Sequence, residues 1–248
     1  MGRRGGLDDL IANKQRLMTC GLADGRGTIL QFGVYTGHSL RYLTRTLREN
    51  RVRFGRVVGF DSFQGLPEES APPELSMTGG DRAFSRGEFN AADALRVHSW
   101  PELRDKVLQY INHDGVILVR GYFNESLSPL LVREHGLLEP ALWVDLDVDQ
   151  YVGTMQAFEW LMSAGLVVPG TYVSYDDFND EFDTDPPGGP VALAHQTLTA
   201  RYGIRWRPIF SNHKRHKWWY EVFQVVSVSR PPAPHRYAAK LSQYPGCI

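Results

Sequence analysis

Short apolar runs alternate with segments of helical periodicity along the chain. The first run, residues 28–33, leads through a glycine turn into residues 38–49, where leucines recur on one helical face. Two further runs, 56–61 and 115–119, are separated by a long loop and by a predicted helix over 100–110. Strands that alternate with helices in this way predict an α/β fold with a mostly parallel sheet.

The second half of the chain continues the alternation. The stretch at residues 62–87 is too long for a simple connection, and loops of that length are usually functional. A single domain over residues 1–230 is predicted, with an amino-terminal helical segment at 1–27 and a Pro-rich tail at 231–248. We expect helices over 126–135, 152–163 and 191–202, and strands over 141–147, 171–175, 204–210 and 220–228.

Charge and composition narrow the class of protein. The 248 residues include 27 basic and 28 acidic side chains, a net charge of −1, and the basic ones are scattered. Nucleic-acid-binding domains usually carry a basic stripe, so we expect no nucleic-acid partner. No apolar run approaches the ~20 residues that span a bilayer, and no apolar segment follows the basic amino terminus. We therefore expect no membrane association and a cytoplasmic location.

The turn after the first strand is a candidate ligand site. Its glycines permit a tight turn and a close approach of the backbone to a ligand, and the helix that follows offers free N–H groups. The G-x-G-x-x-G spacing of dinucleotide-binding folds is missing, which disfavours an NAD-dependent enzyme. An ordinary strand–helix turn is the alternative. The candidate residues are Gln31, Gly33, Tyr35, Thr36, Gly37 and Ser39.

A carboxylate, Asp61, ends the second predicted strand. In parallel α/β sheets a carboxylate in this place can accept hydrogen bonds from the hydroxyls of a ribose bound over the first strand. Alternatively, Asp61 caps a turn. Because ligands of such sheets bind beyond the carboxyl ends of the strands, the glycine turn and Asp61 are predicted to share one site.

Acidic residues also follow two later strands. Asp145, Asp147 and Asp149 stand at the end of the fourth predicted strand, and Asp176 and Asp177 at the end of the fifth. Crowded carboxylates are unfavourable unless they share a proton or a cation. Oxygen ligands without His or Cys suit a hard divalent ion such as Mg²⁺, with Mn²⁺ or Ca²⁺ as alternatives. A solvated acidic rim that caps helices is the other interpretation.

Five motifs in order give the chain a family resemblance. The most specific is the Asp61-Ser-Phe-Gln-Gly-Leu-Pro67 run, and the resemblance covers roughly residues 28–228. Together the motifs resemble the macrocin-type (TylF/MycF-like) sugar O-methyltransferases of antibiotic biosynthesis. The other four are the glycine turn, Arg120-Gly-Tyr-Phe123, the Asp147-x-Asp149-x-Tyr151-x-x-Thr154 pattern and Asp176-Asp177-Phe178.

The resemblance implies a class I S-adenosylmethionine-dependent methyltransferase fold. This is a three-layer Rossmann-like fold whose seven-stranded sheet has the order 3-2-1-4-5-7-6 and ends in a reversed hairpin. It also implies S-adenosylmethionine as cofactor, S-adenosylhomocysteine as product, and Mg²⁺ bound beside neighbouring sugar hydroxyls. The acceptor would be a hydroxylated small molecule, most plausibly a glycosylated natural product, and residues 62–87 would lie on its side of the site. A homo-oligomer is left open.

Roles follow from the resemblance by position. Gly33 to Ser39 would hold the methionine part of the cofactor and Asp61 its ribose. The adenosine side would be lined by Ser62, Phe63, Arg120 and Gly121. Asp149 would be the general base, and the metal ligands would be Asp147, Asp176 and Asp177.

Among the departures of the sequence from the family pattern, two bear on the proposed roles. The family usually carries Glu where this chain has Gln31, which replaces a charged contact by a neutral one. The additional Asp145 leaves the register open: if the strand ends two residues earlier, Asp145 becomes the ligand and Asp147 the base. The later register is preferred because Tyr151 and Thr154 then match the motif.

The rival functions are of three kinds. A catechol-like O-methyltransferase of the same fold would use vicinal hydroxyls in the same way, and a cofactor-binding homologue without catalysis would retain the fold alone. An NAD-dependent enzyme is the most distant. Among the histidines, His195 follows the acidic pair in the sequence, where a substrate could reach it.

Overall fold

The structure is a computed structural model of the chain, and it describes residues 27–49, 51, 54–68, 85–176, 178, 189–211 and 221–233. Within these residues seven strands form one sheet with the order β3-β2-β1-β4-β5-β7-β6. The predicted order is confirmed. The strands are β1 (Thr28–Phe32), β2 (Val57–Asp61), β3 (Val116–Arg120), β4 (Ala141–Leu146), β5 (Tyr172–Tyr175), β6 (Ile204–Ser211) and β7 (Glu221–Val228).

The first five strands run parallel and the last two form the reversed hairpin. β1 pairs in parallel with β2 and β4, while β7 pairs antiparallel with both β5 and β6. Helices separate the strands along the chain. They are α3 (His38–Glu49), α4 (Ala91–Leu95), α5 (Trp100–Ile111), α6 (Phe123–Ser126), α7 (Leu131–Glu134), α8 (Tyr151–Ser163) and α9 (Gly189–Tyr202).

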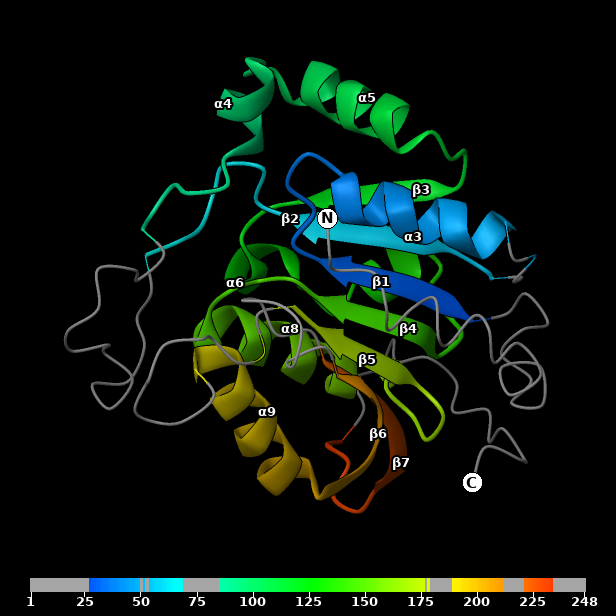
Figure 1. The fold of residues 1–248 in the computed structure, drawn as a ribbon. Helices are drawn as coiled ribbons and strands as arrows, with labels where there is room; N and C mark the ends of the chain where they lie inside the picture. The colour runs from blue at the N-terminus through cyan, green and yellow to red at the C-terminus, as the bar shows by residue number, and fades with distance from the viewer. Residues whose placement is uncertain are drawn as a thin grey trace.

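Two apolar clusters cover the two faces of the sheet. Side chains of α3 and α5 pack on one face against Ile29 and Val57. Side chains of α8 and α9 pack on the opposite face against Leu30, Phe32 and Val58. Alternate residues of β1 therefore enter different clusters, as the period of two in a strand requires. Figure 1 shows the resulting three layers, with α3 and α5 above the sheet and α8 and α9 below it.

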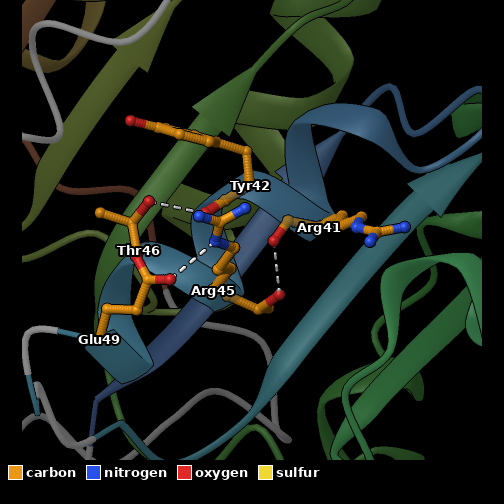
Figure 2. A network of polar contacts seen from close by, with 6 residues as sticks. Arg41, Tyr42, Arg45, Thr46 and Glu49 are labelled. Atoms are coloured by element: carbon orange, nitrogen blue, oxygen red, sulfur yellow. Dashed lines mark hydrogen bonds and ion pairs between the residues drawn. The ribbon is translucent and has the colours of Figure 1, made fainter.

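Helix α3 follows the glycine turn and presents one apolar face. Leu40, Leu43 and Leu47 are buried, while Arg45 and Glu49 form an exposed ion pair one helical turn apart, with 2.8 Å between Nε and Oε1 (Figure 2). Exposed pairs of this kind contribute only about 0.3–0.5 kcal/mol. The leucine face therefore holds α3 on the sheet, and the turn before it is fixed by that packing.

The structure differs from the predicted elements in two places, and it moves several predicted bounds by one or two residues. The helix predicted over residues 126–135 is replaced by two short helices, α6 and α7, with Gly121 at φ +138° just before them. The helix α4 was not predicted; Asn90 caps it by accepting hydrogen bonds from the N–H groups of Ala92 and Asp93. Strand β4 ends at Leu146, one residue before the predicted end.

Three predicted segments fall mostly outside the described residues. These are the amino-terminal segment at 1–27, the 62–87 loop, of which residues 62–68 and 85–87 are described, and the tail at 231–248, of which residues 231–233 are described. No helix among the described residues is long and apolar enough to cross a membrane.

Candidate active site

A cavity of about 430 Å³ lies beyond the carboxyl ends of β1, β2 and β4. This is the edge at which parallel sheets bind ligands. We call it the main cavity. Its described lining comes from the glycine turn, the start of the 62–87 loop, the segment after β3 and the segment after β4. The lining residues are Gly33, Tyr35, Asp61, Ser62, Gly65, Leu66, Pro67, Glu68, Phe89, Gly121, Tyr122, Phe123, Asn124, Asp147, Val148, Asp149, Gln150, Val152, Gly153 and Gln156.

Asp61 joins the glycine turn to the end of β2. Its Oδ2 accepts hydrogen bonds from the N–H groups of Val34 and Tyr35 at 2.7 and 2.8 Å, and its Oδ1 accepts one from Phe63 at 2.5 Å. Burial raises the pKa of the Asp61 carboxyl, and the three backbone donors oppose that effect. Asp61 therefore does cap a turn. A carboxylate can accept further hydrogen bonds beside these three, so the capping role leaves room for a ribose hydroxyl.

The glycine turn can only be built with glycine at its first position. Gly33 has φ +85°, and a Cβ on it would collide with the carbonyl oxygen of Asp147. The N–H of Asp147 in turn donates to the carbonyl of Phe32 at 2.9 Å. Backbone from the β1 turn and from the end of β4 is therefore in direct contact. Gly37 has the same φ, and a Cβ there would press on Ile111 and Val107 of α5.

Gln31 is fully buried beneath this turn. Its Nε2 donates to the carbonyl of Gly33 and to the hydroxyl of Ser39, each at 2.8 Å. Ser39 lies in the first turn of α3, so one amide group joins the two ends of the glycine turn. Thr36 and Gly37 lie between them; Tyr35 is 37% exposed and its ring is 5.8 Å from that of Phe89, edge to face.

The acidic residues after β4 separate into two environments. Asp145 is inside the strand and buried, and its Oδ1 accepts a hydrogen bond from Ser174 of β5 at 2.5 Å. Asp147 and Asp149 come after the strand and line the main cavity. Asp149 has φ +59°, an uncommon conformation for a residue other than glycine. This geometry favours the later register, with Asp147 and Asp149 at the site and Asp145 in the sheet.

Asp176 lies beside Asp147 at the neighbouring strand end. Leu146 and Tyr175 are paired in register, and the N–H of Asp176 donates to the carbonyl of Leu146 at 3.0 Å. Asp176 is only 5% exposed. Asp177 lies outside the described residues, and the described part of the chain holds no group of three His, Cys, Asp or Glu side chains arranged for a metal ion. Two carboxylates at adjacent strand ends are oxygen donors of the kind that a hard cation takes.

A second hollow of about 350 Å³ lies on the β3 side of the main cavity. We call it the Arg120 hollow. Phe63 and Trp100 are in ring contact with centroids 5.0 Å apart, and the Arg120 guanidinium lies 5.5 Å from the Trp100 centroid. The predicted residues Phe63 and Arg120 thus line this hollow and not the main cavity. Its lining is Phe63, Gln64, Arg86, Gly87, Asn90, Ala92, His98, Trp100, Leu103, Arg120 and Tyr122.

The remaining predicted residues shape the walls. The Ser62 hydroxyl donates to the carbonyl of Gly65 at 2.7 Å and accepts from the N–H of Gln64, which forms a tight turn at the mouth of the main cavity. The N–H of Gly121 donates to the Asp61 carbonyl at 2.9 Å. Sequence reasoning did not single out Phe89 or Trp100. Their only signals were local: Phe89 is an aromatic residue just before the capping Asn90, and Trp100 is an aromatic residue at the first position of α5.

His195 does not line either hollow within the described residues. Its Nδ1 is 3.2 Å from the Tyr175 hydroxyl, and its ring contacts those of Phe178, Trp206 and Phe223. Burial lowers the pKa of His195 to about 4 and raises the pKa of the Tyr175 hydroxyl. The histidine is therefore a neutral member of an aromatic cluster between α9, β5, β6 and β7.

Comparisons with known proteins agree with this fold. Residues 7–183 match the sequence profile of the macrocin-O-methyltransferase (TylF) family. A curated relative from Streptomyces olivaceus is 28% identical over 170 residues, and its name describes a 4'-O-methyltransferase of 8-demethyl-8-(2,3-dimethoxy-alpha-L-rhamnosyl)-tetracenomycin C. The match covers 68% of this chain but 59% of that protein, so the chain spans less than two thirds of the relative.

Two solved structures share the fold. The O-methyltransferase NovP is similar with a TM-score of 0.58 and 22% identity, and the calicheamicin methyltransferase CalS11 with a TM-score of 0.55 and 20% identity. Each similarity covers 88% of this chain and 80% of the other. At these identities the likeness establishes the fold.

Proposed function

We propose that this chain, which belongs to the macrocin-O-methyltransferase (TylF) family, transfers a methyl group from S-adenosylmethionine to a hydroxyl of a sugar on a small-molecule natural product. The observation that carries the proposal is the main cavity, which brings the glycine turn, Asp61 and the Asp147–Asp149 pair to one wall. The curated relative, named for methylation of a rhamnosyl group, supports a sugar as the acceptor.

The cofactor would lie across both hollows. Gly33 and the turn to Ser39 would receive its methionine part, and Asp61 would accept hydrogen bonds from its ribose. Phe63 and Arg120 would hold the adenine in the Arg120 hollow, where two aromatic rings and a guanidinium are already in contact. S-adenosylmethionine supplies a methyl group on a positively charged sulfur, which becomes a neutral thioether when the methyl leaves.

Asp149 would act as the general base. A sugar hydroxyl is a poor nucleophile near neutral pH, and a positioned carboxylate that accepts its proton contributes about 10²–10⁴-fold to the rate. In this transfer the hydroxyl oxygen would bond to the methyl carbon, the carbon–sulfur bond would break, and the proton would pass to Asp149. The positive φ of Asp149 sets the direction of its Cα–Cβ bond.

A divalent cation fits the donors beside Asp149. Asp147 and Asp176 lie side by side at the ends of β4 and β5, and Asp177 follows in the sequence. We propose that these three carboxylates hold Mg²⁺. When bound, such an ion lowers the pKa of a coordinated hydroxyl and orients it. The proposed role of Asp147 is then to hold the cation, and that of Asp149 to accept the proton.

The charge of the main cavity bears on the acceptor. Its described lining contains four carboxylates, Asp61, Glu68, Asp147 and Asp149, and no basic side chain, together with aromatic rings from four residues. A lining of this kind attracts cations and uncharged apolar groups and repels anions. It favours a neutral glycoside over a sugar that still carries a nucleoside diphosphate. Glycosyl transfer would then precede methylation.

The test is a methylation assay on the purified chain. With S-adenosylmethionine and Mg²⁺, we expect a neutral glycoside with vicinal hydroxyls to gain one methyl group by mass spectrometry. The same sugar as a nucleoside diphosphate and a simple catechol should react at least tenfold more slowly. Calorimetry should show binding of S-adenosylhomocysteine and none of NADH.

Each part of the proposal has its own contradicting result. Binding of NADH without binding of S-adenosylhomocysteine would contradict methyl transfer. Full activity after dialysis against EDTA would contradict the metal. Preference for catechol would move the acceptor from sugars to aromatic diols, and preference for the nucleoside diphosphate would reverse the order of glycosylation and methylation.

A further inference from the structure

The glycine turn rests on one buried amide group, that of Gln31. Its Nε2 donates to two partners, the Gly33 carbonyl and the Ser39 hydroxyl, each at 2.8 Å. The Gly33 carbonyl can only accept, so the amide nitrogen has to face it; the opposite orientation would place two acceptor oxygens together. The Oε1 atom is then directed into the interior, where it accepts no hydrogen bond from the described residues.

A carboxylate could not replace this amide. A glutamate at the same place could accept a hydrogen bond from Ser39, but it has no N–H to donate to the Gly33 carbonyl. That carbonyl belongs to Gly33, and Gly33 lies directly against the backbone of Asp147. Loss of the donor therefore releases the turn at the point where it meets the end of β4.

The neighbours of Gln31 in the sheet add a second reason for an uncharged side chain. In register, Gln31 lies between Gly59 of β2 and Asp145 of β4. Gly59 has no side chain, and paired residues of adjacent strands lie ~4.8 Å apart on the same face. The flanking side chain is thus Asp145, which is buried and hydrogen-bonded to Ser174. A second carboxylate here would set two like charges side by side in the interior, which is unfavourable.

We infer that Gln31 is a positioning residue for cofactor binding and that its neutrality is matched to Asp145. Gln31 holds the glycine turn in its bound shape through the Gly33 carbonyl and Ser39. Asp145 fixes the side chain that position 31 can carry. The inference rests on the proposed function, because it assigns the turn to S-adenosylmethionine.

The experiment measures the dissociation constant of S-adenosylhomocysteine by calorimetry on the full chain. We expect Gln31→Glu to weaken binding at least tenfold. Adding Asp145→Asn to that variant should recover the part of the loss that the second charge causes, because asparagine keeps an acceptor for Ser174 and removes that charge. A severalfold loss should remain, because the glutamate still has no N–H to donate to the Gly33 carbonyl. Gln31→Met has similar size but neither donor nor charge, so it should weaken binding severalfold, and Asp145→Asn should not restore it.

A matched control separates these effects from a change in overall charge. Gln109 is exposed on α5, and Gln109→Glu should leave the dissociation constant unchanged. Thermal unfolding identifies the variants that fold. If Gln31→Glu does not fold alone, two other comparisons carry the test. One compares Gln31→Met with and without Asp145→Asn, and the other compares the folded Gln31→Glu/Asp145→Asn variant with the parent.

Two results would overturn the inference. One is a Gln31→Glu variant that binds as tightly as the parent; the other is an Asp145→Asn change that restores nothing to it. A parent chain that binds no S-adenosylhomocysteine at all would overturn the proposed function as well, so the two failures are distinguishable.

Discussion

The main cavity and the Arg120 hollow share Tyr122 and differ in charge. The described lining of the main cavity has four carboxylates and no basic side chain, whereas that of the Arg120 hollow has Arg86, His98 and Arg120 and no acidic one. The chain as a whole is almost neutral, with a net charge of −1. Acidic side chains therefore line one hollow and basic side chains line the adjacent one, although the net charge of the chain is close to zero.

This difference means that the two halves of the proposed cofactor would lie in different electrostatic environments. In the Arg120 hollow, aromatic rings and a guanidinium suit a flat, uncharged base. In the main cavity, carboxylates suit a positive sulfur and a cation, and one of them can take a proton. Asp61 lies between the two, since its carboxylate is bonded to Tyr35 on one side and Phe63 on the other.

The largest expected effect is in the main cavity, from Asp149→Asn. Asparagine tolerates the positive φ of this position, so the change removes the charge without straining the backbone. We expect kcat to fall about 10²–10⁴-fold, the usual contribution of a general base, while the dissociation constant of S-adenosylhomocysteine stays within about twofold of the parent value. Rapid-quench assays and calorimetry check this. Turnover close to that of the parent would mean that another residue is the general base.

The next prediction concerns the buried His195, which lies outside the main cavity, and measures the stability of the chain as a function of pH. Burial lowers the pKa of His195 from 6.5 to about 4, so the unfolded chain binds a proton before the folded chain does. The contribution of neutral His195 to the free energy of unfolding is fully present above pH 6.5 and is lost as the pH falls toward 4. The free energy of unfolding should fall by about 3 kcal/mol over this range. Urea unfolding at several pH values should show this decline, and His195→Phe should remove it.

The control for that experiment is the exposed His98. Its side chain is 75% exposed, so His98→Phe should leave the decline in place. If His195→Phe instead abolishes turnover at pH 7 in a fully folded protein, His195 has a role at the site that its position in the aromatic cluster does not suggest.

Asp61→Ala tests the junction between the two hollows. The change removes the acceptor of three backbone N–H groups, those of Val34, Tyr35 and Phe63. We expect S-adenosylhomocysteine to bind roughly 10- to 50-fold more weakly, since hydrogen bonds to charged groups are worth about 1.5–3 kcal/mol each and part of the loss falls on stability. Calorimetry and thermal unfolding together measure both. Unchanged binding would refute the ribose role.

The smallest effect is expected in the Arg120 hollow. Arg120 lies over Trp100 and is exposed, so Arg120→Met should weaken cofactor binding only about two- to fivefold, the range of an exposed cation–π contact. The KM of the acceptor should not change. Arg104→Met, on the exposed side of α5, is the matched control. A larger effect on the acceptor than on the cofactor would assign this hollow to the acceptor.

The sequence predicted most of the sheet and helix α3, because their apolar periodicity is strong and local. The predicted bounds of α3 agree with the structure at both ends. Residues 126–135 did not follow the prediction, since Gly121 redirects the chain after β3 and the Trp160 indole donates to the carbonyl of Ser128, which ties this segment to α8. Helix α4 has only five residues, too few for periodicity to be visible.

The candidate site was predictable where its residues follow the ends of predicted strands. The glycine turn, Asp61 and the Asp147–Asp149 pair all do so, and the topology of a parallel sheet brings them together. The Arg120 hollow is assembled from residues between 63 and 122 whose proximity depends on how α4 and α5 pack, which no local pattern contains. Likewise, the neighbour of Gln31 is Asp145, 114 positions away, and only the sheet register shows it.

The contact between Gly33 and the Asp147 carbonyl has a consequence for how this site can change. A Cβ on Gly33 would collide with the Asp147 carbonyl oxygen, so no side chain fits between the glycine turn and the end of β4, and a substitution at Gly33 cannot widen the gap between them. Variation of the cavity would have to come from residues such as Glu68 and Phe89, two exposed members of its lining. For an engineer, the contact at Gly33 is the fixed part of the cavity and these exposed side chains are the adjustable part.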